Sequence, residues 1–453
     1  MTLFRRDVFP LLTLALPLVL AQLAQTSMGF VDTLMIGRLG NEALAGIALG
    51  SIFFHLIQIV LSGVLFAVNP VVSQAFGAKK EDDVGRAVRQ GLWLASLLFI
   101  PAFLLFYFAK PILLVMGQEA DTVTLASSYL RAITWGLLPA LWIVPLRGLL
   151  EGVSNTRPIM LISFLAVGFN IVANNALMFG RWGFPELGLV GTAYASALAF
   201  TLSFILLALY VSRLYERFAI FSRLRSPDPK MMRDLLVIGV PIALTLGFEV
   251  GMFSTTGFLM GLLGQAELAA QQIAMQTASV TFMVPLGLSV ATSIRVGQAV
   301  GQGDRAASRR AGFTGMAMSA VFMCFTALAF WLAPHFIIGL YLDTSLTENA
   351  NVVALATSFF AIAAMFQIFD GFQVSAAGAL RGLKDTRVPM FITLLSYWII
   401  GIGSGVWLCF GLDLGGRGLW FGLVLGLATA ALLLSWRFYW LVSTKKVDAV
   451  TVT

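Results

Sequence analysis

Charge is scarce in this chain of 453 residues: Asp, Glu, Lys and Arg make up 11%, whereas 59% of the residues are hydrophobic. A soluble globular protein carries about 25% charged residues, so the shortage excludes that class. The apolar runs are long enough to cross a lipid bilayer as helices of about 20 residues. We therefore predict an all-α membrane protein. Its twelve predicted spans cover residues 8–37, 43–76, 84–109, 123–145, 158–179, 188–211, 235–263, 268–296, 311–333, 352–379, 388–410 and 419–441.

Cysteine and histidine are also rare, with two of each. Cys324 and Cys409 fall inside predicted spans and provide neither a disulfide framework nor a CxxC metal motif, so we expect both to be small core residues. His55 and His335 do not supply the constellation that an intramembrane enzyme needs. The GxxxxGK[ST] motif of ATP-hydrolysing proteins is missing. We therefore expect a protein that is not an enzyme, has no cofactor and does not hydrolyse ATP.

Positive charge is distributed unevenly between the predicted loops. With the N-terminus in the cytoplasm, the cytoplasmic side receives most of the 29 Lys and Arg residues. The outer side receives only Arg38, Lys110, Arg131, Arg181 and Arg417. This bias predicts a multi-pass protein with both termini in the cytoplasm. The net charge of +7 is then a consequence of topology, and it does not indicate a nucleic-acid partner.

The two halves of the chain repeat each other. Residues 11–90 align without a gap to residues 235–314, and LLEGVSNTR from Leu149 resembles ALRGLKDTR from Ala379. Each copy holds six predicted spans, so both copies enter the membrane from the same side, as in the parallel repeats of some secondary transporters. We predict an N-lobe over 1–212, a cytoplasmic linker over 213–234 on the hinge side, and a C-lobe over 235–453.

Three carboxylates stand in the middle of apolar segments: Asp32, Glu249 and Asp370. A charged side chain at this depth costs about 3 kcal/mol or more, so it usually carries function. No Lys or Arg lies at similar depth in the same segments, and we expect the missing counter-charge to be a ligand: a proton, a metal cation or a cationic substrate. Burial favours the protonated form of a carboxylic acid, so Asp32 can bind and release a proton. The alternative for Asp32 is a helix-terminal acid that water or Arg38 satisfies.

Polar side chains accompany two of these acids. Gln25 lies two helical turns before Asp32 and shares its face, and Gln367 and Gln373 flank Asp370 three residues away on either side. We interpret Gln25 and Gln367 as residues that line a substrate cavity. Hydrogen bonding between helices is the alternative role for the glutamines around Asp370.

Further polar residues raise two questions that spacing does not decide. Asn170 and Asn174 share one face of FNIVANNALMFG, where they either bond between helices or line a cavity. Glu249 and Asp370 would form a site for a hard cation such as Na⁺ if they approach each other, because such ions prefer oxygen ligands.

Five segments carry a family resemblance: AQTSMGFVDTLMIG around Asp32, PVVSQAFGA from Pro70, GFEV with Glu249, SIRVGQ from Ser293 and FQIFDGFQVSAAGALRG around Asp370. Together with the repeat, they resemble multidrug and toxic compound extrusion (MATE) transporters, in particular the NorM-type bacterial branch. The resemblance implies a monomer of twelve helices in two six-helix lobes in the bacterial inner membrane. It also implies antiport of organic cations, such as dyes and fluoroquinolone-like drugs, against Na⁺ or H⁺.

The resemblance also implies roles for single residues. Asp32 would be the acid of the N-lobe, and Glu249 and Asp370 would be the acids of a C-lobe cation site. Gln272 and Phe282 match a glutamine and an aromatic residue of the eighth helix that approach this site in NorM-type proteins.

One residue departs from the pattern of the family. Phe366 stands where some NorM-type members have Tyr, which removes one possible ligand of the cation. A lipid-linked oligosaccharide flippase of the same superfamily is the alternative function. A flippase would need a basic cavity for pyrophosphate, whereas the charges inside these spans are acidic.

Overall fold

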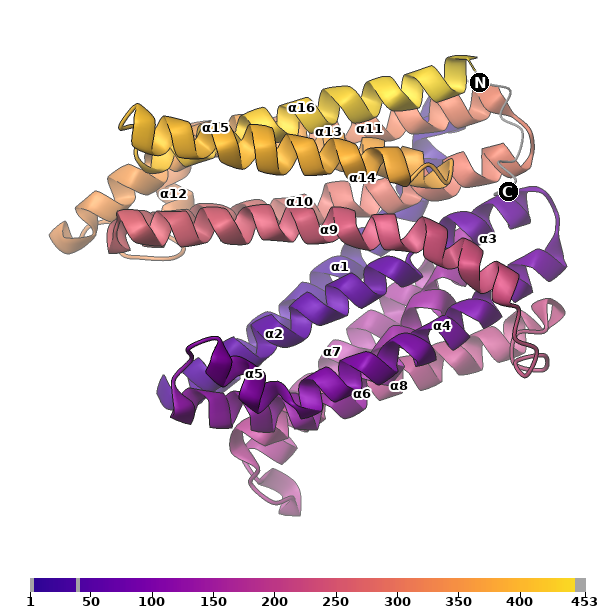
Figure 1. Ribbon diagram of the computed structural model, residues 1–453, viewed down its shortest axis with the longest axis horizontal. Helices are drawn as coiled ribbons and strands as arrows, with labels where there is room; N and C mark the ends of the chain where they lie inside the picture. The colour runs from indigo at the N-terminus through magenta and orange to yellow at the C-terminus, as the bar shows by residue number, and fades with distance from the viewer. Residues whose placement is uncertain (1–3, 38–40, 445–453) are drawn as a thin grey trace. The chain divides into compact units, whose positions relative to one another are not determined.

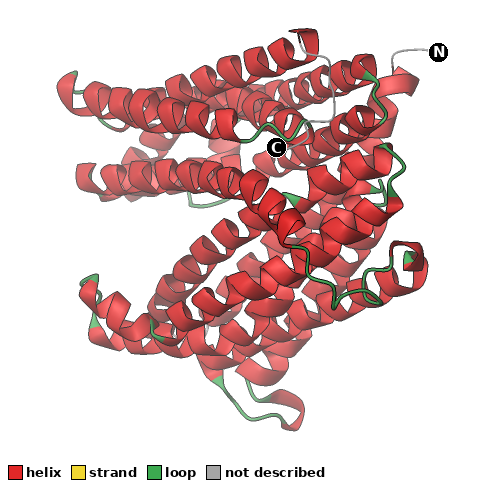
Figure 2. Ribbon diagram, turned by 45° about the vertical axis from the view of Figure 1, so that its right-hand side comes forward, coloured by secondary structure: helices red, strands yellow, loops and turns green. Residues whose placement is uncertain are grey.

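The structure is a computed structural model that describes residues 4–37 and 41–444. Within these ranges the chain forms helices joined by turns, with no strand (Figure 2). Twelve helices are long and apolar enough to cross a membrane, which confirms the prediction of an all-α protein with twelve spans. Residues 445–453, predicted to be cytoplasmic, lie outside the described residues.

Figure 1 shows the helices of the two halves, which follow one another along the chain. The first half contains α1 (Phe9–Ile36), α2 (Asn41–Leu65), α3 (Val68–Gly77), α4 (Glu81–Tyr107), α5 (Ala109–Val115), α6 (Ala120–Gly152), α7 (Arg157–Met178) and α8 (Gly188–Leu214). The second half contains α9 (Pro229–Leu263), α10 (Gln265–Gly301), α11 (Arg305–Leu332), α12 (Pro334–Ile338), α13 (Ala350–Gly382), α14 (Arg387–Leu394), α15 (Gly403–Val406) and α16 (Gly416–Thr444).

The second span is broken, although its counterpart in the other half is continuous. α2 ends at Leu65 and α3 begins at Val68. Pro70 explains the break, because proline lacks the N–H that would bond to the carbonyl of Phe66 and its ring clashes with that carbonyl. In the repeat alignment Ile294 occupies the position of Pro70, and there the chain continues as the single helix α10.

The eleventh span changes its winding part-way across. After α14 the chain continues as a π-helix, η6 (Leu395–Ile402), and a second π-helical stretch, η7 (Trp407–Gly411), follows α15. π-Helical insertions in α-helices are frequent at functional sites. Tyr397 lies in the first of these insertions and is fully buried.

The chain forms two compact units whose limits differ from those of the predicted lobes. One unit is Leu20–Ala243, and the other combines Met1–Val19 with Leu244–Thr453. Both limits fall inside helices, α1 and α9, and the repeat alignment pairs Val19 with Ala243. Each unit therefore contains the first part of the leading helix of the other half.

Two glycines allow close packing of the exchanged helix starts, which are the part of α1 up to Val19 and the part of α9 up to Ala243. A Cβ atom at Gly63 of α2 would lie 2.7 Å from the Cα of Ala243, and a Cβ at Gly287 of α10 would lie 2.5 Å from the Cγ2 of Val19. The repeat alignment also pairs Gly63 with Gly287. The same close contact therefore occurs once in each unit, and both copies depend on glycine.

The segment before α9 is bound to α4 rather than free. Arg89 donates hydrogen bonds to the carbonyls of Phe218 (3.3 Å) and Ala219 (3.0 Å), and Trp93 Nε1 donates to the carbonyl of Leu224 (2.7 Å). Gln90 Nε2 donates to the carbonyl of Ser226, and Gln90 Oε1 accepts from the backbone N–H of Asp228. α9 itself begins at Pro229, within the predicted linker. The predicted linker 213–234 therefore lies entirely within the unit Leu20–Ala243.

An arginine fixes the end of this linker. Arg86 of α4 donates two hydrogen bonds to Oδ2 of Asp228, the residue before α9, and these bonds hold the pKa of the Asp228 carboxyl below its usual range. The repeat alignment pairs Arg86 with Arg310, whose Nε lies 3.5 Å from Oδ1 of Asp7, just before α1. The first helix of each half, α1 and α9, thus begins just after an aspartate that pairs with an arginine.

In the unit that combines Met1–Val19 with Leu244–Thr453, the core is rich in aromatic side chains around α13. α13 packs there against α10, α11 and α16. Phe359, Phe366 and Trp420 are buried there, and Cys409 is buried among them as predicted. The prediction for Cys324 is wrong, because its side chain is exposed on α11. It follows the buried Met323 directly, so it points about 100° away around the helix.

Candidate functional site

The first cluster of polar side chains surrounds Asp32 in the unit Leu20–Ala243. Asp32 lies on α1, Asn170 and Asn174 lie on α7, and Ser196 lies on α8. Asn174 Nδ2 donates to Asp32 Oδ1 at 2.5 Å, and Ser196 Oγ donates to Asp32 Oδ2 at 3.1 Å. Both carboxylate oxygens of Asp32 therefore accept a hydrogen bond from a neutral group.

The two asparagines connect the cluster internally. Asn170 Oδ1 accepts from Asn174 Nδ2 at 3.1 Å, and Asn170 Nδ2 donates to Ser196 Oγ at 3.2 Å. Both asparagines are fully buried, which confirms that they share one helix face. Of the two roles left open by the sequence, they perform the bonding between helices.

One oxygen of this cluster has no partner in the described part of the chain. Oδ1 of Asn174 is buried and accepts no hydrogen bond, while Nδ2 of the same amide is used by Asp32 and Asn170. A carbonyl oxygen beside a carboxylate offers two of the ligands that a hard cation prefers, and the carboxylate alone can take a proton. The geometry therefore suits a small cation or a proton.

Gln25, predicted to share the helix face of Asp32, makes none of the hydrogen bonds of Asp32 in the described residues. Gln25 is exposed on α1, and its Oε1 accepts from Arg147 at 3.5 Å. Arg38, the alternative partner of Asp32, lies outside the described residues. The partners of Asp32 come from α7 and α8 instead.

The second cluster lies in the other unit, around Asp370 on α13. Asp370 is 4% exposed, and its Oδ1 accepts from Gln373 Nε2 at 3.3 Å. The hydroxyl of Tyr397 in turn donates to Gln373 Oε1 at 3.0 Å. Tyr397 thereby fixes the orientation of the amide that holds the Asp370 carboxylate.

Glu249 of α9 belongs to the same region. Its carboxylate and that of Asp370 interact electrostatically, and both act on Tyr397. Two carboxylates that repel each other in a buried place favour a cation or a proton between them. The structure therefore brings together the two acids whose proximity the spacing left undecided.

A basic residue from the end of α13 also acts on this cluster. Arg381 in the last turn of α13 attracts the charge of Glu249, and its Nη2 donates to Ser289 Oγ at 2.8 Å. The flexible stem of arginine lets a charge at the end of a helix extend along it. Glu249 therefore has a partial counter-charge from the protein itself.

Comparison with known proteins identifies the family of the chain. The MatE family model matches residues 17–175 and 241–407, which covers most of both halves. The chain belongs to the MatE family.

Relatives and solved structures extend the comparison over nearly the whole chain. The "Probable multidrug resistance protein NorM" of Mesorhizobium japonicum is 41% identical over 440 residues, covering 96% of this chain and 94% of the relative. The "Multidrug resistance protein NorM" of Burkholderia vietnamiensis is 42% identical over 428 residues, covering 94% and 92%. The crystal structure of the eukaryotic MATE transporter AtDTX14 superposes with a TM-score of 0.84 at 23% identity, covering 96% of each chain. This last likeness establishes the shared fold.

The resemblance implies that Gln272 and Phe282 approach the C-lobe cation site, and the spacing around Asp370 adds Gln367 to the candidate cavity residues. Gln272 is exposed and Phe282 half-buried on α10, and neither takes part in the hydrogen bonds of Asp370 in the described residues. Gln367 is buried, and its Oε1 accepts from Thr281 (2.6 Å) and Thr326 (3.2 Å). Gln367 therefore joins α13 to α10 and α11.

Two residues of this MatE protein escaped the sequence-based prediction. Ser196 stands among small residues of α8, where a serine has no distinctive pattern. Tyr397 had a signal, because it is the single tyrosine of the eleventh span. Phe366 packs against Phe253 and Trp420, and the hydroxyl of Tyr397, in the same buried core, bonds to Gln373.

Neither cluster resembles a resident metal centre. In the described residues, no group of three or more His, Cys, Asp or Glu side chains is placed to hold a metal ion. Any ion at Glu249 and Asp370 would be bound by two carboxylates and by neutral oxygens.

Proposed function

We propose that the protein is a secondary active multidrug exporter that moves organic cations, such as dyes and fluoroquinolone-like drugs, out of the cell in exchange for Na⁺ or H⁺. It acts as a monomer in the bacterial inner membrane, with both termini in the cytoplasm. Membership of the MatE family and the names of the NorM relatives support this proposal.

The observation that carries the proposal is the presence of acids inside spans of both units. Asp32 is held by neutral donors, Glu249 and Asp370 repel each other, and Arg381 offsets part of the charge of Glu249. Exchange of cations requires sites that hold a positive charge inside the membrane and release it again. Acids whose partners do not neutralise them meet both requirements.

The two clusters have different roles in this proposal. Glu249 and Asp370 share one coupling ion, Na⁺ or H⁺, whose charge removes their repulsion. Asp32 acts separately, binding a proton or a drug cation within its own unit. Each ligand drives transport only by as much as its affinity differs between the inward-open and outward-open states. Gln25, Gln272 and Phe282, exposed or half-buried beyond the acids, are proposed to contact the drug.

The test is transport by the purified protein in sealed vesicles. Proteoliposomes loaded with ethidium receive either an Na⁺ gradient or a pH gradient, in the absence of ATP. We expect efflux of the dye with at least one of the two gradients. Asp370→Asn should abolish this efflux, and the matched control Asp343→Asn, the same chemical change in an exposed loop outside the spans, should not alter it.

Two outcomes would overturn the proposal. Efflux that requires ATP and ignores both gradients would exclude ion exchange. Flipping of a lipid-linked oligosaccharide without any dye transport would support the alternative function in the same superfamily.

A further inference from the structure

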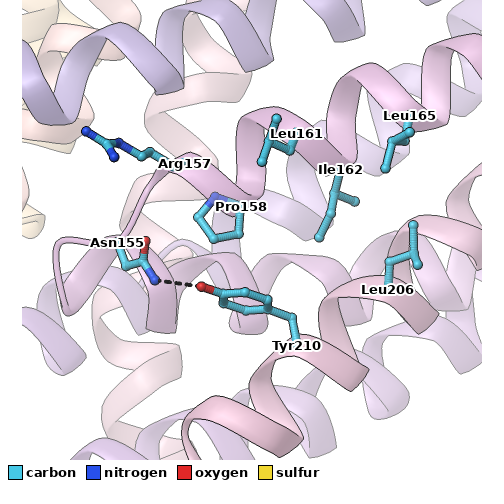
Figure 3. A pocket seen from close by; sticks show the side chains of 8 residues that line it. All are labelled: Asn155, Arg157, Pro158, Leu161, Ile162, Leu165, Leu206 and Tyr210. Carbon is cyan, nitrogen blue, oxygen red and sulfur yellow. Dashed lines mark hydrogen bonds between the residues drawn. The ribbon is translucent and has the colours of Figure 1, made fainter.

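A groove of about 430 Å³ lies between α7 and α8 (Figure 3). Leu161 and Leu165 of α7 and Leu206 of α8 line its apolar part. Both helices belong to the twelve candidate spans, and Leu161 and Leu165 are 57% and 59% exposed. Exposed leucines on spanning helices face hydrocarbon in a bilayer, so a lipid acyl chain is the natural occupant of this part of the groove.

One end of the groove is polar. Asn155 and Tyr210 meet there, and Arg157 also lines this end, with its flexible side chain directed away from Tyr210 in the structure (Figure 3). Arg157 is the exposed first residue of α7, and none of the ion pairs in 4–37 and 41–444 includes it. A guanidinium without a carboxylate at the end of a spanning helix leaves a positive charge for an external anion.

The hydroxyl of Tyr210 adds a hydrogen-bond donor at this end. Asn155 Nδ2 donates to Tyr210 Oη at 3.1 Å and to Tyr215 Oη at 2.8 Å. Because the Tyr210 oxygen accepts this bond, its own hydrogen can point toward another acceptor. A guanidinium and a phenolic hydroxyl at the end of one groove are suited to a phosphate group.

We propose that this groove binds an anionic phospholipid. One acyl chain lies along the leucines of α7 and α8, Arg157 pairs with the phosphate, and Tyr210 donates a hydrogen bond to it. A free phosphate ion would use only the polar end and would leave the apolar part of the groove without a role. Basic sites between spanning helices are known to select acidic headgroups.

The binding can be measured on the full-length protein in detergent by native mass spectrometry. The two probes are dioleoylphosphatidylglycerol, which is anionic, and dioleoylphosphatidylethanolamine, which is zwitterionic. Arg157→Ala removes the charge, and Leu165→Trp fills the apolar part. Arg387→Ala is the matched control, because Arg387 holds the equivalent position in the echoed segment ALRGLKDTR, is exposed at the start of α14 and does not line this groove.

We expect the unaltered protein to bind the phosphatidylglycerol more tightly than the phosphatidylethanolamine. Arg157→Ala should weaken phosphatidylglycerol binding about fivefold and remove the preference, as expected for loss of one basic residue at a membrane surface. Leu165→Trp should weaken the binding of both lipids, and Arg387→Ala should change neither. The melting temperature of each variant shows whether it is folded.

Several results would overturn the proposal. These are unchanged phosphatidylglycerol binding by folded Arg157→Ala, equal binding of the two lipids by the unaltered protein, or an equal loss in Arg387→Ala. Inorganic phosphate that competes fully with the lipid would show an anion site without a place for the acyl chain. If Leu165→Trp does not fold, the two arginine variants still decide the question. No transport is measured, so the result is independent of the proposed export function.

Discussion

Gly63 and Gly287 offer a test of the exchanged helix starts, because each is too close to the neighbouring helix for any side chain. A Cβ at Gly63 would lie 2.7 Å from the Cα and 3.1 Å from the Cβ of Ala243, and a Cβ at Gly287 would lie 2.5 Å from the Cγ2 and 3.0 Å from the backbone nitrogen of Val19. Ordinary van der Waals contact begins at 3.4 Å. An alanine at Gly63 or Gly287 must therefore push the helices apart.

The size of the effect follows from two opposing contributions. Overpacking of this kind costs about 1–3 kcal/mol. Replacing a helical glycine by alanine returns up to about 1 kcal/mol through helix propensity. With the full propensity gain, we therefore expect Gly63→Ala and Gly287→Ala to cost up to about 2 kcal/mol, which is about 1–3 kcal/mol below a helical Gly→Ala change without overpacking. In a domain of roughly this size, each kcal/mol lowers the melting temperature by about 2–4 °C.

The assay is the melting temperature of the purified protein in detergent, with one control for each unit. Gly168 of α7 and Gly257 of α9 are helical glycines. A Cβ added to either would meet no atom of another element within 4 Å in the described residues. Gly168→Ala and Gly257→Ala should leave the melting temperature unchanged or raise it. If Gly63→Ala and Gly287→Ala melt at the same temperature as these controls, the close contacts do not hold the helix starts, and the reasoning is refuted.

Four further predictions concern the polar clusters and the linker. In direct ion-binding measurements, Glu249→Gln and Asp370→Asn should each lower the affinity for the coupling ion at least about tenfold, which corresponds to about 1.4 kcal/mol. The double variant should be no worse than either single variant, and additive losses would contradict a shared ion. Asp32→Asn should keep ion binding but lose dye transport, and loss of both would contradict separate sites. Tyr397→Phe should keep the fold but weaken ion binding and change its dependence on pH, whereas an unchanged pH profile would make Tyr397 only a packing residue. Arg89→Met removes two charge-assisted hydrogen bonds to the linker, which are worth about 3 kcal/mol together. Tryptic cleavage of residues 215–228 should therefore increase on the order of a hundredfold. Arg233→Ala, at an exposed arginine, is the control.

The ion pair at the end of the linker has a pH dependence whose sign is fixed. Arg86 lowers the pKa of Asp228 in the folded protein, so this pair stabilises the linker above the ordinary carboxyl pKa of about 4. Its contribution is lost as the pH falls through the lowered pKa of the folded state. Protection of the linker from cleavage should therefore not vary with pH near neutrality.

Features that depend on local pattern could be predicted from the sequence. Apolar length fixes the twelve spans, because a spanning helix must satisfy its backbone groups internally. Helical periodicity places Asn170 and Asn174 on one face, and the structure confirms it. The cost of burying a carboxylate singles out Asp32, Glu249 and Asp370 without any knowledge of their neighbours.

Features that depend on packing between distant segments could not be predicted. Ser196 reaches Asp32 from a helix that lies far along the chain, and its sequence context is that of any small residue in a span. Arg381 lies in the last turn of α13, and no local pattern indicates that it acts on Glu249 of α9. The limits of the two units fall inside helices, two residues after Pro17 of α1 and Pro241 of α9, and no polar linker marks them.

The exchanged helix starts have a consequence for coupling. α1 begins in one unit and carries Asp32 in the other, and α9 likewise begins in one unit and carries Glu249 in the other. A ligand that binds at either acid therefore acts on a helix whose first part belongs to the opposite unit. Loosening the helix start should then weaken transport without removing the ion site. We expect Gly63→Ala to lower the amount of dye exported per ion while ion binding at Glu249 is retained, and a variant that loses both together would show that the contact serves the site itself.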